Sequence, residues 1–439
     1  MTFSLFLLYL AATFIFPGEL FPELAPYRIT FWLGIVCLTL TILTVAPTGR
    51  LTVFAWPIGL VAGLIVSMML SVIWADRWMG APLFVIQSFG PALTLFLLTV
   101  WNVTSMRRLT ITAAVLVLTA VALAAQGIAA YHFGYMQDKL LLHQNEDDSP
   151  PDDGSGATAS GLIRVRGLGQ VSDPNDLALV LVATLPLMGL AWKESHTFRN
   201  ILVVGLPAAL LVYGVYLTRS RGGTLGVLAV LFVALVQRVS RTKALLATAA
   251  MAAVLVAANF TGGRAISNAD DSAEGRIEAW SEGLDMLRSS PILGVGFRNF
   301  TEHNSLTAHN SFVLCFAELG MVGYFFWMGL LVVAILQIQE VRRGGVDGLE
   351  AHQLRKHAHL LIAAFSGMLV SAFFLSRSYN PVLYLFVALA LVLYNLAGSS
   401  GLPVAQFSGL RVSRRVVVLE FVSIVTIYAL VRANRTLNL

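Results

Sequence analysis

The sequence predicts an all-α polytopic membrane protein with about twelve transmembrane helices and a long loop on its outer side. Its 439 residues are 57% hydrophobic and only 12% charged, whereas soluble domains average about 45–50% apolar and about 25% charged residues. The mean hydropathy is +0.77. Apolar runs of about 17–25 residues recur along the whole length, each long enough to cross roughly 30 Å of hydrocarbon. No internal repeat or second soluble region interrupts them, so residues 1–439 are expected to form one membrane domain.

Twelve apolar runs are expected to cross the membrane, and a thirteenth stretch, 415–431, is left out of that number. The twelve runs are 3–16, 28–46, 52–75, 83–101, 109–133, 176–192, 199–217, 222–237, 243–259, 311–338, 357–376 and 380–397. The stretch 415–431 carries Glu420 and precedes Arg432 and Arg435, which a crossing would place on the outer side. Lying along the cytoplasmic face, or pairing as a half-span, costs less.

The Lys and Arg residues of the short loops orient the chain, because cytoplasmic loops carry an excess of them. With the N-terminus in the cytoplasm, fifteen cations lie in cytoplasmic turns and five in short outer loops. The cytoplasmic ones are Arg50, Arg107, Arg108, Lys193, Arg199, Arg238, Arg241, Lys243, Arg342, Arg343, Arg355, Lys356, Arg411, Arg414 and Arg415. The outer ones are Arg28, Arg77, Arg219, Arg221 and Arg377.

Two long loops, 134–175 and 260–310, then fall on the outer side. The first contains the acidic, Pro- and Gly-rich stretch 144–156, a composition typical of a solvated loop. Asp173 or Asn175 is expected to cap the helix that follows it. Cys37 and Cys315 lie in apolar runs, which predicts buried thiols and no disulfide framework.

This topology places four groups of basic or imidazole side chains on the outer side of the membrane. They are Arg164 with Arg166, Arg219 with Arg221, Arg276 with Arg288, and His309. Arg219 and Arg221 flank a tight turn between two apolar helices, where a guanidinium is costly unless it meets an anion. Two interpretations stay open: phosphate binding through the planar fork of Arg, or snorkelling toward head groups and pairing with an acidic residue.

His309 precedes an apolar helix, and Asn310 and Ser311 beside it supply capping chemistry. An imidazole titrates near neutral pH and takes a proton from an attacking hydroxyl, but a lone His at a helix end is more often a polar boundary residue. His303, six residues earlier, has the same local chemistry. No His, Cys or carboxylate set has metal-ligand spacing, and no Walker loop or dinucleotide fingerprint is present, so neither a metal nor a cofactor is expected.

Two glycine-containing motifs lie on either side of His309 in the sequence. Gly320 and Gly323 are expected to be close-packing positions on the helix after His309. The segment Pro291-Ile-Leu-Gly-Val-Gly296 is expected to turn the second long loop back to the membrane.

Together these motifs resemble the O-antigen ligase and polymerase superfamily. The residues that carry the resemblance are Arg221-x-x-x-Leu225, Arg276-x-x-x-Trp280, Pro291 to Gly296, and His309-Asn310 followed after nine residues by Gly320-x-x-Gly323. Each motif alone is weak, and the specific part is the His-Asn-x9-Gly-x-x-Gly spacing between a large outer loop and a helix.

The resemblance implies a GT-C-like glycosyltransferase of the bacterial inner membrane, whose long loops and active site face the periplasm. Such enzymes transfer a glycan from undecaprenyl pyrophosphate, and in ligases the acceptor is the lipid A–core oligosaccharide. The reaction is taken to be metal-independent and inverting. His309 would act as general base and Arg221 would hold the pyrophosphate. Arg219, Arg164, Arg166, Arg276 and Arg288 would support it, with Asn310 counted among the substrate-binding residues.

Three alternatives remain beside a ligase. An O-antigen polymerase would join one lipid-linked glycan to another, and a protein O-oligosaccharyltransferase often carries additional sequence toward its C-terminus. A transporter of lipid-linked sugars would more naturally show buried charges or broken helices near the bilayer centre. The pI near 9.3 adds nothing about nucleic acid, because the cytoplasmic Lys and Arg account for the basicity, and no nucleic-acid partner is expected.

Overall fold

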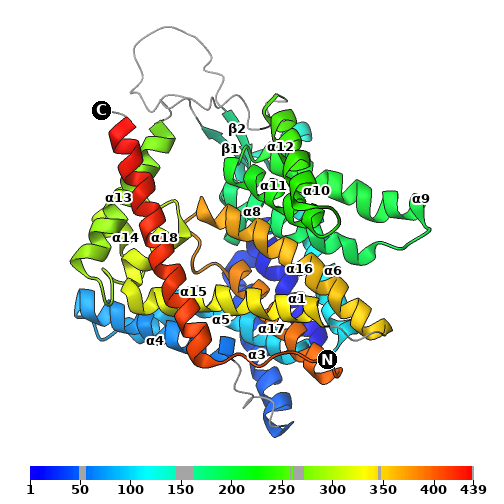
Figure 1. Ribbon diagram of the computed structural model, residues 1–439, viewed down its shortest axis with the longest axis horizontal. Coiled ribbons are helices and arrows are strands. Elements are labelled where there is room, and N and C mark those ends of the chain that lie inside the picture. The colour runs from blue at the N-terminus through cyan, green and yellow to red at the C-terminus, as the bar shows by residue number, and fades with distance from the viewer. Residues whose placement is uncertain (49–55, 145–161, 258–259, 261–270, 345–347, 438–439) are drawn as a thin grey trace.

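The computed structural model describes the chain except for residues 49–55, 145–161, 258–259, 261–270, 345–347 and 438–439. The acidic stretch 144–156 of the first loop falls almost wholly outside the described residues. The regular secondary structure of the described part is helical apart from one short hairpin, which confirms an all-α polytopic membrane protein (Figure 1).

The helices longer than one or two turns fall in two groups along the chain. The first group is α1 (Thr2–Ile15), α3 (Ile29–Val45), α4 (Trp56–Asp76), α5 (Ala81–Asn102), α6 (Met106–Phe133), α8 (Pro174–Thr184), α10 (Leu206–Leu217), α11 (Arg221–Val236) and α12 (Arg241–Ala257). The second group is α13 (Asp271–Ser289), α15 (Ser311–Arg343), α16 (Leu349–Phe373), α17 (Pro381–Ser399) and α18 (Gly409–Leu437).

Short turns connect them. They are α2 (Pro17–Leu20), η1 (Pro22–Tyr27), η2 (Ala46–Thr48), α7 (Gln137–Leu140), η4 (Gly169–Val171), η5 (Leu185–Ala191), α9 (Thr197–Asn200), η6 (Ile201–Gly205) and α14 (Phe300–His303). The strands β1 (Leu141–Gln144) and β2 (Leu162–Val165) pair antiparallel, with Leu141 opposite Val165.

Ten helical segments of the described chain are long and apolar enough to cross a membrane. They include nine of the twelve predicted spans and also Gly409–Thr436. Of the other three, the spans at 3–16 and 222–237 correspond to the shorter apolar helices α1 and α11. The span at 243–259 corresponds to α12 as far as Ala257. The number twelve therefore stays a prediction.

The helix α15 is the centre of the bundle, because it packs against α4, α16, α17 and α18. Its neighbour α17 is buried along nearly its whole length, between α15, α16 and α5. The ring stack of Trp327 and Tyr324 on α15 and the buried Tyr384 on α17 belong to this core. Large apolar side chains elsewhere point outward, such as Phe31 and Trp32 on α3. An outward apolar surface of this kind suits lipid rather than water.

The stretch 415–431 is helical throughout. It forms most of α18, a continuous helix that packs against α15 and reaches α13 (Figure 1). At its far end Arg435 Nη2 donates to Ser281 Oγ of α13 over 2.8 Å. The helix Gly409–Thr436 is long and apolar enough to cross a membrane, although the sequence left this stretch out of the predicted spans. One face of α18 is buried against α15, and Glu420 is 2% exposed in this packing.

We call the end of the bundle that carries α13 and the β1–β2 hairpin the outer end, after the orientation that the sequence predicts. The second predicted loop, 260–310, holds two helices, α13 and α14, in its described part. The first loop, 134–175, holds α7, the hairpin and η4. At its end, Asp173 Oδ1 accepts from Asn175 N over 2.7 Å as the N-cap of α8, which confirms the predicted cap.

Candidate active site

The helix α15 is broken at Gly320, and the loop 291–296 fills the break. Gly320 has φ 61° and ψ −167°, a conformation essentially restricted to glycine. Val295 N and Gly296 N donate to the carbonyls of Ala317 and Glu318, both over 3.0 Å. In return, Met321 N and Val322 N donate to Pro291 and Ile292 over 2.8 and 3.2 Å. The four backbone groups freed by the break are thus satisfied by the loop.

The contact is too close for any side chain at its two central glycines. A Cβ on Gly320 would lie 2.4 Å from the carbonyl carbon of Ile292, and one on Gly294 would lie 2.3 Å from that of Glu318. Gly320 is therefore a close-packing position, as the sequence predicted, and it is also a break in the helix, which the sequence did not predict. Gly323 also packs closely, since a Cβ there would lie 3.1 Å from Ser67 Oγ on α4.

The first residues of α15 set the position of His309. Asn310 is the N-cap, and its Oδ1 accepts from Phe312 N and Val313 N over 2.8 and 3.2 Å. This confirms the predicted cap, and Asn310 is fully buried. Ser311 Oγ donates to Leu375 O over 2.6 Å and accepts from Arg377 N over 3.0 Å. His309 is thereby held between a capped helix and the 374–380 loop, with its backbone at φ 46°.

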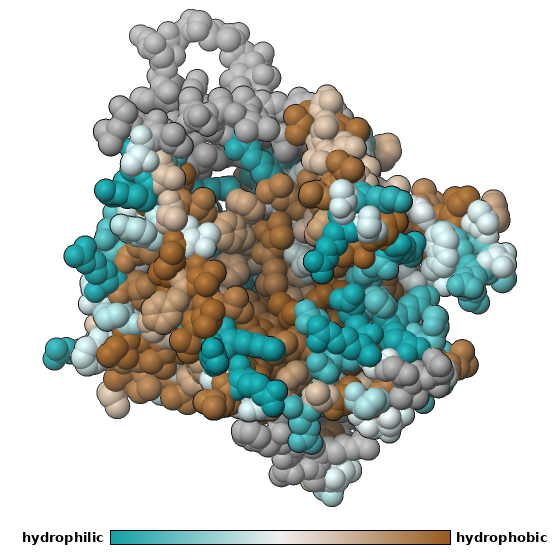
Figure 2. Space-filling model, viewed as in Figure 1, coloured by the Kyte–Doolittle hydropathy of each residue, from teal (hydrophilic) through white to brown (hydrophobic). Residues whose placement is uncertain are grey.

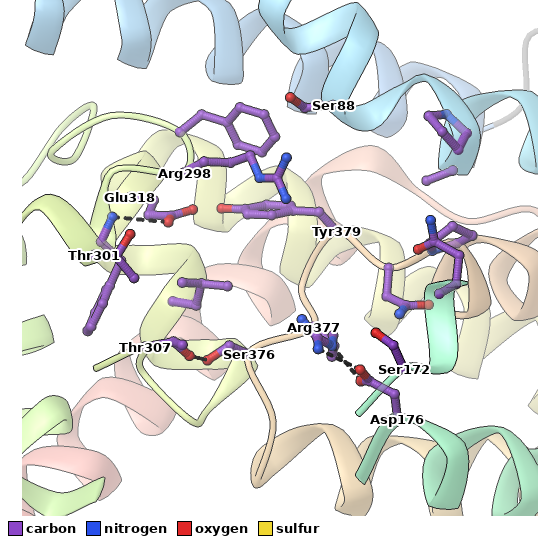
Figure 3. A pocket seen from close by; sticks show the side chains of 18 of the residues that line it. Ser88, Ser172, Asp176, Arg298, Thr301, Thr307, Glu318, Ser376, Arg377 and Tyr379 are labelled. Atoms are coloured by element: carbon purple, nitrogen blue, oxygen red, sulfur yellow. Dashed lines mark hydrogen bonds and ion pairs between the residues drawn. The ribbon is translucent and has the colours of Figure 1, made fainter. Parts of the chain in front are cut away.

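A cavity of about 630 Å³ opens beside this point at the outer end (Figure 3). Its wall is made by parts of α5, η4, α8, the 297–307 segment, α15 and the 376–381 loop. The lining residues are Gln87, Ser88, Pro91, Ala92, Gly169, Gln170, Ser172, Asp176, Phe297, Arg298, Phe300, Thr301, Thr307, Leu314, Glu318, Ser376, Arg377, Tyr379, Asn380 and Pro381. Hydroxyl, amide, guanidinium and carboxylate groups dominate this wall, a combination suited to a polyhydroxylated ligand.

Two charged arrangements occupy opposite parts of the wall (Figure 3). In one, Arg377 makes a two-point ion pair with Asp176, a carboxylate that is 3% exposed. In the other, Glu318 Oε1 accepts from Phe300 N over 3.3 Å, and the Tyr379 hydroxyl points toward the carboxylate of Glu318. Burial and the charge of Glu318 raise the pKa of the Tyr379 phenol well above its ordinary value, so it stays a donor.

His309 lies next to the cavity, although it is not part of the wall. Burial lowers the pKa of its imidazole, and the charge of Arg276 lowers it further. Asp173 acts in the opposite sense, and Arg377 adds a smaller lowering effect. The side chain is therefore neutral at neutral pH, which is the form that accepts a proton.

The predicted cations divide into those that the structure connects to this region and those that it does not. Arg164 is 6% exposed; its Nε donates to Thr218 O and its Nη2 to Asn175 Oδ1, both over 3.0 Å. It thus joins the turn of Arg219 and Arg221 to the start of α8, where Asp176 meets Arg377. The Arg219 guanidinium lies 4.0 Å from the centre of the Tyr216 ring.

Arg221 is the first residue of α11, whose N-cap Ser220 accepts from Gly223 N over 3.1 Å. The N-terminus of such a helix favours anions. Gly222, the next residue, approaches the 374–380 loop, because a Cβ there would lie 3.1 Å from Phe374 Cβ. This turn is thereby close to the loop that carries Arg377.

Arg166, Arg276 and Arg288 have different surroundings. Arg166 Nε donates to Lys139 O over 2.9 Å, on the α7 side of the hairpin. Arg276 acts electrostatically on His309. Arg288 is exposed and lies twelve residues further along α13, which is roughly 18 Å at 1.5 Å per residue. The structure therefore places Arg276, and not Arg288, beside His309.

Sequence reasoning did not select Asp176, Glu318, Arg298, Tyr379 or Arg377 as site residues. Arg377 appeared only as a loop cation, and Asp176 and Glu318 were covered by predicted apolar spans. A carboxylate within an apolar span is costly unless it is paired. This rule could have identified Asp176 and Glu318 from the sequence.

The chain matches one family model, and the match falls on this region. Residues 206–328 match the model described as O-antigen ligase. The matched segment contains Arg219, Arg221, Arg276, His309 and the break in α15. No curated protein matches the chain.

Proposed function

We propose that this chain, which belongs to the O-antigen ligase and polymerase superfamily, is an O-antigen ligase. It transfers a glycan from undecaprenyl pyrophosphate to the lipid A–core oligosaccharide on the periplasmic face of the bacterial inner membrane. The superfamily supports ligase- or polymerase-type activity of a membrane glycosyltransferase, and the ligase reaction, its substrates and its GT-C-like topology are our proposal.

The observation that carries the proposal is the position of His309, which lies next to a polar cavity and directly before the capped helix α15. An acceptor hydroxyl in the cavity would give its proton to the imidazole as its oxygen bonds to the anomeric carbon. The bond from that carbon to the pyrophosphate oxygen breaks on the opposite side, so the anomeric centre inverts. The leaving pyrophosphate takes the bonding electron pair and gains negative charge.

Cations placed where this charge develops would stabilise it. Arg221 and Arg219 flank the N-cap of α11, and Arg164 connects their turn to α8 and hence to the cavity wall. We assign the pyrophosphate to this turn, with Arg276 and Arg166 in support. Arg288 is the weakest of these candidates because of its distance along α13.

A transporter of lipid-linked sugars would use a broken helix and buried charges, and both occur here. However, the break at Gly320 has its backbone groups satisfied by the 291–296 loop, and Asp176 is paired with Arg377. These features therefore serve the cavity wall, and the family match favours an enzyme.

The test is glycan transfer by purified protein in nanodiscs, with undecaprenyl-pyrophosphate glycan, lipid A–core acceptor and a chelator. The proposal expects acceptor-linked product with an inverted anomeric centre, together with a strong loss of product in Arg221→Ala. Donor glycans that lengthen without acceptor would instead indicate a polymerase. Absence of transfer to lipid A–core, glycan and protein acceptors would contradict an enzyme of this class.

A further inference from the structure

A second cavity, of about 540 Å³, lies between α15 and α18, away from the outer end. Leu336 in its wall lies 18 residues beyond Glu318 of the first cavity. This separation is roughly 27 Å along α15, close to the roughly 30 Å thickness of a hydrocarbon core. The two cavities therefore lie near opposite faces of the membrane.

The wall of this groove has an apolar part and a basic part. The apolar part is Val332, Ile335 and Leu336 of α15 with Val418 and Leu419 of α18. The polar part is Gln339 of α15 with Arg411, Arg414 and Arg415 of α18. In Figure 2, hydrophilic surface lies at the lower end of α18 as drawn in Figure 1, and apolar surface continues along the helix.

The three arginines of the groove share one face of α18 and have no acidic partner among the described residues. Arg411, Arg414 and Arg415 are exposed and stand three and four residues apart, a spacing at which like charges repel. The acidic residue nearest in sequence to Gln339 is Glu340, and it pairs with Arg343 over 3.7 Å. Glu420 on α18 is buried and does not line the groove. An anion in the groove would relieve this repulsion.

A small soluble anion would leave the apolar wall without a partner. Val418 and Leu419 are 52% and 42% exposed, and they lie on the same groove as the guanidinium groups. A phospholipid fits both parts of the groove. Its phosphate can bind the arginines, and its acyl chain can lie along the apolar wall.

We propose that this groove binds an anionic phospholipid of the membrane leaflet opposite the substrate cavity. Its phosphate lies against Arg411, Arg414 and Arg415, and an acyl chain lies along Leu336 and Val418. The proposal does not depend on the glycan reaction, because no residue of the first cavity takes part in it.

The test is native mass spectrometry of the purified full chain, titrated with phosphatidylglycerol or with the zwitterionic phosphatidylethanolamine. We expect preferential retention of phosphatidylglycerol by wild type. The triple variant Arg411→Gln, Arg414→Gln, Arg415→Gln should lose that preference. Each cation near an anionic surface is worth about fivefold in affinity, so the triple variant should weaken binding by up to roughly 100-fold.

The matched control removes the same charge from the same predicted face but outside the groove. Arg107→Gln, Arg238→Gln, Arg241→Gln changes three exposed arginines with no ion pair in the described part of the chain. This control should retain the lipid, and an equal loss there would contradict a specific site and indicate a general charge effect.

A second variant separates the apolar wall from the charges. Leu336→Trp fills the groove and keeps all three arginines, so it should also lose phosphatidylglycerol. Retention by both Leu336→Trp and the groove triple variant would overturn the proposal. Displacement of the lipid by millimolar inorganic phosphate would also overturn it, because the groove would then be a simple anion site.

Discussion

The break at Gly320 makes a direct prediction about substitution by alanine. Gly320→Ala places a Cβ 2.4 Å from the backbone of Ile292, at a φ of +61°. A non-glycine residue in this region costs about 1–3 kcal/mol. The loop must also withdraw, which endangers four backbone hydrogen bonds worth about 0.5–1.5 kcal/mol each. The expected destabilisation is therefore about 3–9 kcal/mol, against typical total stabilities of about 5–15 kcal/mol.

The assay is thermal unfolding in detergent, followed by intrinsic fluorescence. We expect Gly320→Ala to lower the Tm by at least about 5 °C, with transfer activity falling in parallel because His309 starts the same helix. Gly294→Ala, with φ +71° and a Cβ 2.3 Å from Glu318, should behave alike.

The control is Gly398→Ala, an exposed position of α17 where a Cβ would make only an ordinary contact, 3.5 Å from Val404 Cγ2. In a regular helix this change gains up to about 1 kcal/mol of helix propensity, so the Tm should stay level or rise. A Gly320→Ala protein as stable and active as wild type would refute the break in α15.

Three further predictions concern charges and topology. Arg276→Gln removes a charge that lowers the pKa of His309; the pKa should rise, and the acid limb of the kcat/KM profile should move to higher pH. Asp176→Asn leaves the Arg377 guanidinium without its partner and should cost about 2–3 kcal/mol in thermal unfolding, below the value for fully buried pairs because Arg377 is 39% exposed. If α18 crosses the membrane, Arg432→Cys should react with an impermeant maleimide from the outer side of intact spheroplasts.

Each of the three has an internal control. Arg288→Gln, on the same helix as Arg276, should leave the pH profile unmoved, and an equal shift would contradict the local origin of the effect. Replacing Asp176 and Arg377 together by Leu and Met should cost less than Asp176→Asn alone, since no unpaired charge remains. Cys37 and Cys315 are buried, so background labelling should be low, and labelling of position 432 only after lysis would place the end of α18 inside.

Much of the fold could be predicted from local sequence patterns, because apolar runs and helix caps depend only on residues that are close in the sequence. Composition and apolar runs predicted the membrane class, and capping chemistry predicted the starts of α8 at Asp173 and of α15 at Asn310. The break at Gly320 was hidden, because a glycine inside an apolar helix has the same local pattern whether it packs or breaks. Only the loop at 291–296 distinguishes the two.

The candidate site was predicted in part for the same reason. His309 and Arg221 stood out through motif spacing, and both lie in the segment matched by the O-antigen ligase model. The partnership of Asp176 with Arg377 joins residues 201 positions apart, and no local signal connects them. The burial of Glu420 within 415–431 was not predicted either, because it depends on where α18 packs and not on the local sequence.

A pair of histidine variants tests most directly whether His309 is the base of the proposed glycosyl transfer. His303, an exposed residue of α14, is the matched control for an imidazole in the same segment. We predict that His309→Ala lowers kcat for acceptor glycosylation by about 10²–10⁴-fold, with folding unchanged, while His303→Ala keeps near wild-type turnover. Full activity in His309→Ala would contradict the mechanism.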